Sequence, residues 1–190
     1  MGTKGILIAG VGGQGVLRAS DIFAHVVMAA GLDVKKSEVH GMAQRGGCVT
    51  SHVRYGDSVC SPLAKKHDVD ILVSFEKIET LRYLDYVKVN GTIIINTEEI
   101  FPPAVNLGDA IYPTDVIEKV KLSFEKVKVV DASTLALQAG NIRTVNTVIL
   151  GTLSTCLTFE NEIWEEVLKK SFPPKLFSVN MEAFRLGRNI

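Results

Sequence analysis

A glycine-rich segment, residues 10–15 (GVGGQG), has residue types and a spacing that suit anion binding. Its G-x-G-x-x-G pattern follows an apolar run and precedes a stretch with helical spacing of apolar residues. Glycines here permit a tight turn and let backbone N–H groups approach an anion, and the start of a helix adds a favourable potential. The segment therefore predicts a cofactor- or phosphate-binding loop, unless it forms only a tight strand-to-helix turn. The residues assigned to it are Gly10, Gly12, Gly13, Gln14 and Gly15.

A second segment, residues 38–47 (EVHGMAQRGG), also has the composition of a binding loop. Arg45 offers a rigid fork of donors suited to carboxylate or phosphate, and Gln44 can both donate and accept hydrogen bonds. We therefore assign Gln44 and Arg45 to ligand binding. The alternative is a structured loop in which Arg45 pairs with Glu38 or with an acidic helix. The other residues assigned to this loop, which would face an active site or an interface, are Glu38, His40, Gly41, Met42, Gly46 and Gly47.

Other kinds of chemistry have weaker support. A dinucleotide site needs an acidic residue about 20 positions beyond the glycines, and Glu38 suits this better than Asp33, which precedes the second expected strand. The histidines lack a metal-ligand spacing, so we expect no metal site. We assign no catalytic residue, because the chain lacks a serine–histidine–aspartate order, an HExxH motif and a Walker lysine. Cys48 is either a reactive thiol or, as its position in a strand favours, a small buried residue.

Composition excludes several classes of protein. The chain has 190 residues, 46% hydrophobic and 22% charged, which indicates a globular protein and not a disordered one. Basic and acidic residues number 21 each, so the net charge is zero and we expect no nucleic-acid partner. Its three cysteines, Cys48, Cys60 and Cys156, favour a reducing compartment and are too few for a four-cysteine iron–sulfur cluster. Without an apolar stretch long enough for a bilayer, we expect a cytoplasmic protein with no membrane partner.

The zero net charge conceals a local imbalance. Residues 35–66 contain six basic and two acidic residues, a net of +4, and residues 67–130 contain seven basic and eleven acidic residues, a net of −4. The basic block is either a face for an anionic ligand or partner, or a solvated surface with uneven charge.

The elements that must position these segments alternate between strand and helix patterns. We expect strands at residues 5–10, 33–39, 48–55, 58–61, 69–75, 91–96, 110–113 and 127–131. Helices are expected at 16–30, 76–84, 114–122, 133–139, 144–157, 162–170 and 179–187. This order predicts a three-layer, Rossmann-like α/β fold with a mostly parallel sheet, helices on both faces and a β-hairpin addition near residues 48–61.

Together with residues 180–187 (NMEAFRLG), the two glycine-rich segments resemble the gamma-type subunit or domain of the 2-oxoacid:ferredoxin oxidoreductases. The resemblance covers nearly the whole chain and implies one gamma-type domain over residues 1–190. Residues 40–47 (HGMAQRGG) look most like the smaller subunit of the indolepyruvate members of the family.

The resemblance implies a subunit of an enzyme that converts a 2-oxoacid, CoA and oxidised ferredoxin to an acyl-CoA, CO₂ and reduced ferredoxin. This chain has neither the cysteine runs nor the thiamine motif of the family. Thiamine diphosphate, Mg and [4Fe–4S] clusters are therefore expected on a larger partner subunit, through which the complex meets ferredoxin. CoA is expected near this chain, which should be inactive alone.

Two alternatives remain open from the sequence. One is a stand-alone nicotinamide- or flavin-dependent Rossmann oxidoreductase, which would bind its dinucleotide tightly in isolation. The other is a structural subunit whose glycine loops only shape an interface. Apolar residues of the last helices, such as Trp164, Phe172 and Phe177, either serve such an assembly or belong to the core.

Overall fold

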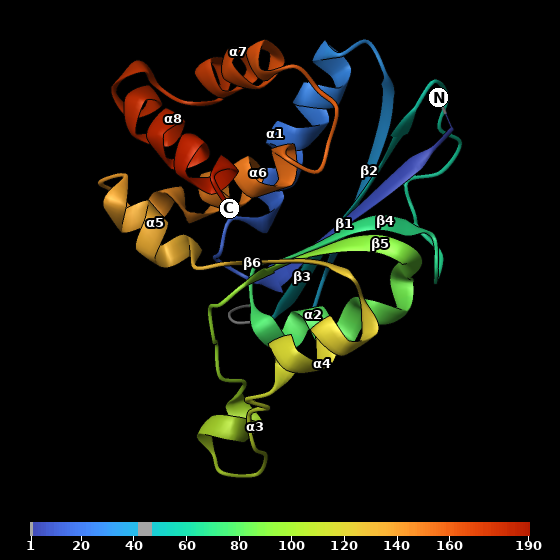
Figure 1. Ribbon diagram of the computed structural model, residues 1–190, viewed down its shortest axis with the longest axis vertical. Coiled ribbons are helices and arrows are strands. Elements are labelled where there is room, and N and C mark those ends of the chain that lie inside the picture. The colour runs from blue at the N-terminus through green and yellow to red at the C-terminus, as the bar shows by residue number, and fades with distance from the viewer. Residues whose placement is uncertain (1, 42–46) are drawn as a thin grey trace.

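The computed structural model describes residues 2–41 and 47–190, and in these ranges one mixed sheet lies between two helical layers (Figure 1). Its strands have the order β2-β3-β1-β4-β5-β6. The strands are β1 (Lys4–Val11), β2 (Asp33–His40), β3 (Cys48–Gly56), β4 (Val69–Ser74), β5 (Val87–Asn96) and β6 (Lys126–Val130). The helices are α1 (Val16–Ala29), α2 (Lys77–Tyr83), η1 (Leu84–Tyr86), α3 (Pro103–Asn106), α4 (Val116–Ser123), α5 (Ala132–Gln138), η2 (Ile142–Thr144), α6 (Val145–Ser154), α7 (Asn161–Ser171) and α8 (Pro174–Arg188).

The expected α/β architecture is confirmed: β1, β4, β5 and β6 run parallel, and β3 pairs antiparallel with both β1 and β2. The antiparallel addition near residues 48–61 is present, but its hairpin partner is β2 and not residues 58–61. Because β1 and β2 occupy both edges of β3, residues 58–61 have no edge to pair with and form a loop. The expected strand at 110–113 is also absent, since the chain there crosses outside the sheet toward α2.

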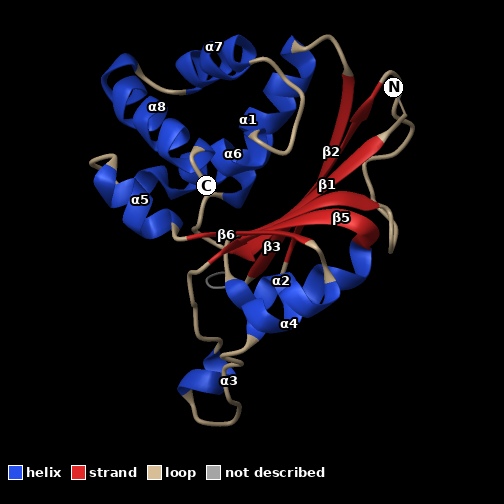
Figure 2. Ribbon diagram, viewed as in Figure 1, coloured by secondary structure: helices blue, strands red, loops and turns tan. Residues whose placement is uncertain are grey.

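Alternating side chains of the strands build a hydrophobic core on each face of the sheet. On one face, Ile6 and Ile8 pack with α1, α6, α7 and α8. On the other, Leu7 and Leu72 pack with α2 and α4. Figure 2 shows the larger helical layer on one side and the α2–α4 pair on the other. A parallel strand covered on both faces must be apolar throughout, which explains the continuous apolar run at the start of the chain.

The C-terminal helices belong to the core. Trp164 is fully buried and its ring stacks near that of Phe23, with ring centroids 6.3 Å apart. Phe172 and Phe177 are partly buried against the same cluster. For Trp164 the core interpretation therefore holds, while for the partly buried Phe172 and Phe177 an assembly role stays a prediction.

Helices α6 and α8 cross with their backbones in close contact, and this explains part of the 180–187 motif. A Cβ on Gly151 would overlap the carbonyl of Phe184, and one on Gly187 would overlap the carbonyl of Val148. Beside this crossing, Asn180 accepts a hydrogen bond of 2.7 Å from the Thr147 hydroxyl. The motif thus holds α8 against α6, and Gly187 acts there by its small size.

We predict that Gly151→Ala destabilises the protein by about 1–3 kcal/mol, because the added methyl group forces the two helices apart. Chemical denaturation monitored by circular dichroism measures this loss. Gly2→Ala serves as the control, since a Cβ there meets nothing within 4 Å. Equal unfolding midpoints for Gly151→Ala and the wild type would contradict the close-packing interpretation.

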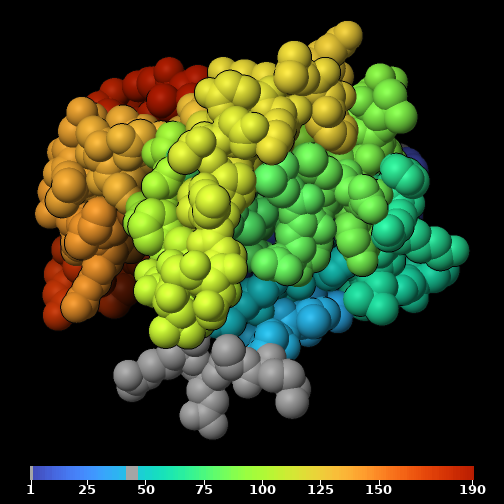
Figure 3. Space-filling view, turned by 90° about the horizontal axis from the view of Figure 1, so that it is seen from below, coloured from blue at the N-terminus to red at the C-terminus, as the bar shows by residue number. Residues whose placement is uncertain are grey.

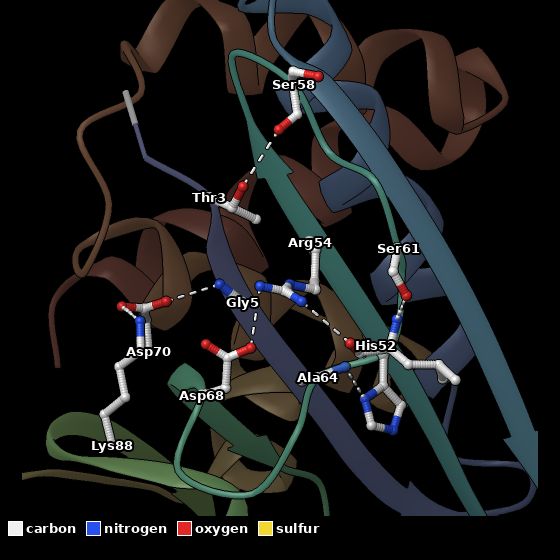
Figure 4. Close-up of polar contacts among 11 residues, drawn as sticks. Thr3, Gly5, His52, Arg54, Ser58, Ser61, Ala64, Asp68, Asp70 and Lys88 are labelled. Atoms are coloured by element: carbon white, nitrogen blue, oxygen red, sulfur yellow. Dashed lines mark hydrogen bonds and ion pairs between the residues drawn. The ribbon is translucent and has the colours of Figure 1, made fainter.

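The loop at residues 57–68 covers the amino-terminal edge of the sheet through polar contacts (Figure 4). Arg54 forms an ion pair of 3.1 Å with Asp68 and donates to the Leu63 carbonyl. The backbone N–H of Ala64 donates to Nδ1 of His52, 3.4 Å away. His52 is buried, and burial lowers its pKa below the usual value. The histidine is therefore held in its neutral form, with Nδ1 as an acceptor.

This histidine predicts a pH-dependent stability. Below about pH 6.5 an unfolded chain protonates His52 while the folded chain resists protonation, so the unfolded state binds more protons. The free energy of unfolding should fall as the pH drops below about 6.5. His52→Asn keeps an acceptor near Ala64 without a titrating ring and should show a shallower decrease between pH 7 and pH 5. Urea unfolding over this range measures both slopes, and identical slopes would refute the assignment.

Candidate functional site

The carboxyl ends of β1 and β4 lie side by side, and the helices that follow these two strands cover opposite faces of the sheet. Helix α1, which follows β1, covers one face of the sheet, and α2, which follows β4, covers the other (Figure 2). In open α/β sheets such a switch point leaves a crevice outside the carboxyl ends of the strands, where ligands bind. The glycine-rich segment 10–15 lies at this point, because it joins β1 to α1.

The glycines of this segment are required by its geometry. Gly13 and Gly15 have φ values of 101° and 85°, in the left-handed region that favours glycine. A Cβ on Gly10 would lie 2.8 Å from Phe75 Cβ and from Val16 Cγ2, so no larger residue fits there. The segment is a tight turn in which Gly12 and Gly13 are exposed to solvent. The two possibilities left open by the sequence, turn and binding loop, are therefore compatible.

Gln14 fixes this loop from within. Its Oε1 accepts a hydrogen bond of 2.7 Å from the Val11 N–H, and its Nε2 donates to the Phe75 carbonyl at 2.9 Å. The side chain thus links the end of β1 to the residue that follows β4. Its ligand-binding role stays a prediction, while its contacts make it the residue that sets the shape of the loop.

A hollow of about 420 Å³ lies beside Gly13 and Gly15. Asn96, at the end of β5, and Arg143, in η2, contribute polar groups to its wall. Arg143 is exposed, so its guanidinium can reach an anion in the hollow. The remaining lining residues are Gln14, Glu98, Ile100, Ser133, Ile142, Val145 and Asn146.

The sequence analysis did not predict the residues that line this hollow. Asn96 could have been predicted, because it ends a clearly recognisable strand whose carboxyl end must reach the same edge of the sheet as that of β1. Arg143 and Asn146 gave no signal, since they lie far from both glycine segments in the chain and reach the hollow only through the packing of α6.

The second glycine segment meets the first through the backbone. The Gly12 N–H donates a hydrogen bond to the Gly47 carbonyl at 2.9 Å. At the base of the loop, the Gly41 N–H donates to the Cys48 carbonyl at 2.8 Å. His40 lines a second hollow, of about 350 Å³, which shares Gly13 and Gly15 with the first. The predicted residues Met42, Gln44, Arg45 and Gly46 lie outside the described residues. The structure therefore brings the described ends of this loop to the predicted binding turn.

The position of Glu38 disfavours a dinucleotide site. Its carboxylate forms an ion pair of 2.6 Å with Lys36. In a nicotinamide-binding Rossmann domain the acidic residue ends the strand next to β1. Here β3 occupies that place with the opposite direction, so β2, which carries Glu38, lies one strand further out.

The basic block at residues 35–66 does not form a free cationic face in the part of the chain that the structure describes. Lys36 pairs with Asp21 and Glu38, Arg54 with Asp68, and Lys66 with Asp85. Because β3 runs antiparallel to β1, Arg54 also lies at the amino edge, away from the glycine loops. For these residues the pairing favours the alternative of a solvated surface with uneven charge over a basic face.

Cys48 lies in a small polar cluster under α2. Its Sγ is 2.9 Å from Oε2 of Glu79 and 3.1 Å from the hydroxyl of Tyr83. The other carboxylate oxygen of Glu79 accepts from Nε of Arg82 at 3.2 Å. Burial and the Glu79 carboxylate raise the pKa of the Cys48 thiol to about 11. Cys48 is thus a protonated, hydrogen-bonded thiol, which supports the structural interpretation over the reactive one.

Two further features concern metals and membranes. Across residues 2–41 and 47–190, no group of three or more histidine, cysteine, aspartate or glutamate side chains is arranged to hold a metal ion. None of the helices in these ranges is both long and apolar enough to span a bilayer.

The chain belongs to the pyruvate ferredoxin/flavodoxin oxidoreductase family, whose match covers residues 5–190. The indolepyruvate oxidoreductase subunit IorB of Thermococcus kodakarensis is 41% identical over 189 residues, covering 96% of this chain and 93% of the relative. The predicted resemblance to the gamma-type subunits of this family is thereby confirmed.

Solved structures share the fold. Pyruvate oxidoreductase subunit PORC from Thermotoga maritima has a TM-score of 0.74 at 23% identity, covering 100% of this chain and 97% of its own. A 2-oxoglutarate:ferredoxin oxidoreductase chain from Magnetococcus marinus has a TM-score of 0.76 at 22% identity, and the match covers 31% of that chain. In the Magnetococcus protein, this fold is thus one part of a longer polypeptide.

The Cys48 cluster predicts a slow thiol. At pH 8, a chain whose only cysteine is Cys48 should react with iodoacetamide at least about tenfold more slowly than one that keeps only the exposed Cys60, because little thiolate is present. Adding Glu79→Gln to the Cys48-only chain should accelerate its labelling, since a neutral amide no longer opposes the thiolate. Mass spectrometry of the labelled chains gives the rates. Equal rates for the two single-cysteine chains would refute the assignment.

Proposed function

We propose that this chain is the non-cluster subunit of a thiamine diphosphate-dependent 2-oxoacid:ferredoxin oxidoreductase that acts on indolepyruvate or a related aryl pyruvate. The observation that carries the proposal is the near-full-length similarity to indolepyruvate oxidoreductase subunit IorB. The reaction converts the 2-oxoacid, CoA and oxidised ferredoxin to an acyl-CoA, CO₂ and reduced ferredoxin. The whole chain, residues 1–190, acts as one domain of this complex in the cytoplasm, and its cysteines are free thiols.

The redox and decarboxylation chemistry belongs to a larger partner subunit. This chain has only three cysteines, and Cys48 is held protonated beside Glu79, so its thiols do not suit a [4Fe–4S] cluster. The described side chains likewise offer no three-ligand group for Mg. Thiamine diphosphate, when bound to the larger subunit, supplies the decarboxylation chemistry. Ferredoxin exchanges electrons with that subunit.

This chain contributes a site for CoA at the edge of the composite active site. Gly13 and Gly15 of the glycine loop line the hollow beside the start of α1, and Arg143 adds a permanent positive charge. These groups suit the phosphates of CoA, and the apolar side chains of Ile100 and Ile142 in the same wall suit its non-ionic parts. Residues 38–47, with Gln44 and Arg45, extend this site or contact the partner subunit.

The two alternatives have less support. A stand-alone dinucleotide enzyme lacks a suitably placed acidic residue, because β3 separates Glu38 from β1. A purely structural subunit would not need an exposed arginine beside a glycine turn that lines a hollow. Co-purification of the native complex, with iron and thiamine measured on it, tests the class. A lone protein with bound NAD would overturn the proposal.

For the CoA site, we predict that Arg143→Ala in the assembled complex raises the KM for CoA about three- to tenfold, because one charge-assisted contact to a phosphate is lost. The KM for the 2-oxoacid should stay unchanged. Arg185→Ala is the matched control, since that exposed arginine pairs with Glu182 on α8 and is not among the residues that line the hollow. Steady-state kinetics with CoA as the varied substrate measures the effect.

Arg45→Ala gives an independent test of the second loop. An increased KM for CoA in an intact complex would support ligand binding by this loop. Loss of assembly, with no change in the KM of the complex that remains, would assign Arg45 to the interface. Unchanged KM values in both Arg45→Ala and Arg143→Ala would contradict a CoA site on this chain.

A further inference from the structure

The connection between β5 and α4, residues 97–115, is much longer than the other strand-to-helix connections of the sheet. We call it the arm. Most connections in α/β units have about 2–6 residues, and those beyond about 12–15 residues are usually functional. The arm contains α3 and projects beyond the helical layers at one end of the molecule (Figure 1). The space-filling view shows the arm, in yellow-green, at the surface of the molecule (Figure 3).

A buried carboxylate ties both ends of the arm to the sheet. Glu76 is 1% exposed, and its Oε1 accepts from the Ile100 N–H at 3.3 Å and from the hydroxyl of Tyr112. Its Oε2 accepts from the Glu79 N–H and caps α2. The rings of Phe101 and Tyr112 also pack, with centroids 5.0 Å apart. The base of the arm is therefore built into the carboxyl edge.

The outer part of the arm is apolar and faces solvent. Ile111 is 94% exposed, Leu107 is 76% exposed and Phe101 is 48% exposed. An isolated exposed apolar residue needs no explanation, but several on one rigidly tethered connection indicate a contact surface.

The charge of the arm specifies what it can meet. Residues 97–115 contain Glu98, Glu99, Asp109 and Asp115 and no lysine or arginine. Glu99 pairs with Lys77 and Asp115 with Lys119, so Glu98 and Asp109 are the carboxylates of the arm for which the described residues show no ion pair. A second copy docked through the same surface would place two such arms against each other, which like-charge repulsion opposes. A partner that fits must instead offer an apolar recess bordered by basic side chains.

We propose that the arm is the docking element for the larger subunit, which receives Phe101, Leu107 and Ile111 in an apolar recess bordered by lysine or arginine. This inference rests on the proposed function, because it assumes the larger subunit. The arm is continuous with the candidate site, since Ile100 at its base lines the same hollow as Gly13 and Gly15. Docking through the arm therefore brings the partner to the mouth of the CoA hollow.

The test uses the purified larger subunit and the full-length chain. The double variant Leu107→Ser/Ile111→Ser should bind the larger subunit at least tenfold more weakly than the wild type, measured by biolayer interferometry. The matched control is Val89→Ser/Leu122→Ser, which changes side chains of similar exposure, 87% and 88%, outside the arm. The control should bind as the wild type does. Thermal melts of the isolated variants verify that both remain folded.

A charge variant tests the recess separately. Asp109→Lys should weaken binding, and the affinity of the wild type should decrease as salt concentration rises. If the wild type binds the larger subunit and the arm double variant binds it with equal affinity, the arm inference is overturned but the proposed function is not. A wild-type chain that does not bind the larger subunit would overturn the proposed function and the arm inference together. Loss of self-association in the arm variant, with binding of the larger subunit retained, would assign the arm to a second copy.

Discussion

The side-chain amide of Gln14 joins the first two parallel strands at the point where ligands bind in this class of sheet. It spans from the Val11 N–H to the Phe75 carbonyl, and so closes the turn on the end of β4. The turn can be this tight because Gly10 has no Cβ to meet Phe75 and Val16, and because Gly13 and Gly15 adopt positive φ. The hollow beside the turn, and the start of α1, take their positions from this set of contacts.

The second organising constraint is the insertion of β3 between β1 and β2. An antiparallel strand at this place starts at the carboxyl edge and ends at the amino edge. Residues at its two ends therefore lie at opposite edges of the sheet, although they are close in the sequence. Cys48, at its start, joins the carboxyl-edge cluster with Glu79 and Tyr83. Arg54, near its end, pairs with Asp68 at the far edge. The same insertion moves Glu38 away from β1 and gives the fold an edge unlike that of a dinucleotide-binding domain.

Stability and the candidate site depend on different regions of the molecule. The α6–α8 crossing, with Gly151 and Gly187 in backbone contact, and the buried Trp164 stabilise one helical layer. The carboxyl edge instead combines a glycine turn, an exposed arginine at position 143 and a tethered, acidic arm.

The sequence by itself determined the local features. The glycine turn, the parallel strands and the fold class follow from short-range patterns, because glycine spacing and apolar periodicity act through the backbone of neighbouring residues. The family could also be recognised from three short motifs. The strand partner of β3, the pairing of the basic block and the wall formed by Asn96, Arg143 and Asn146 were decided only by the tertiary structure. These depend on which distant segments meet, and neither composition nor periodicity encodes that.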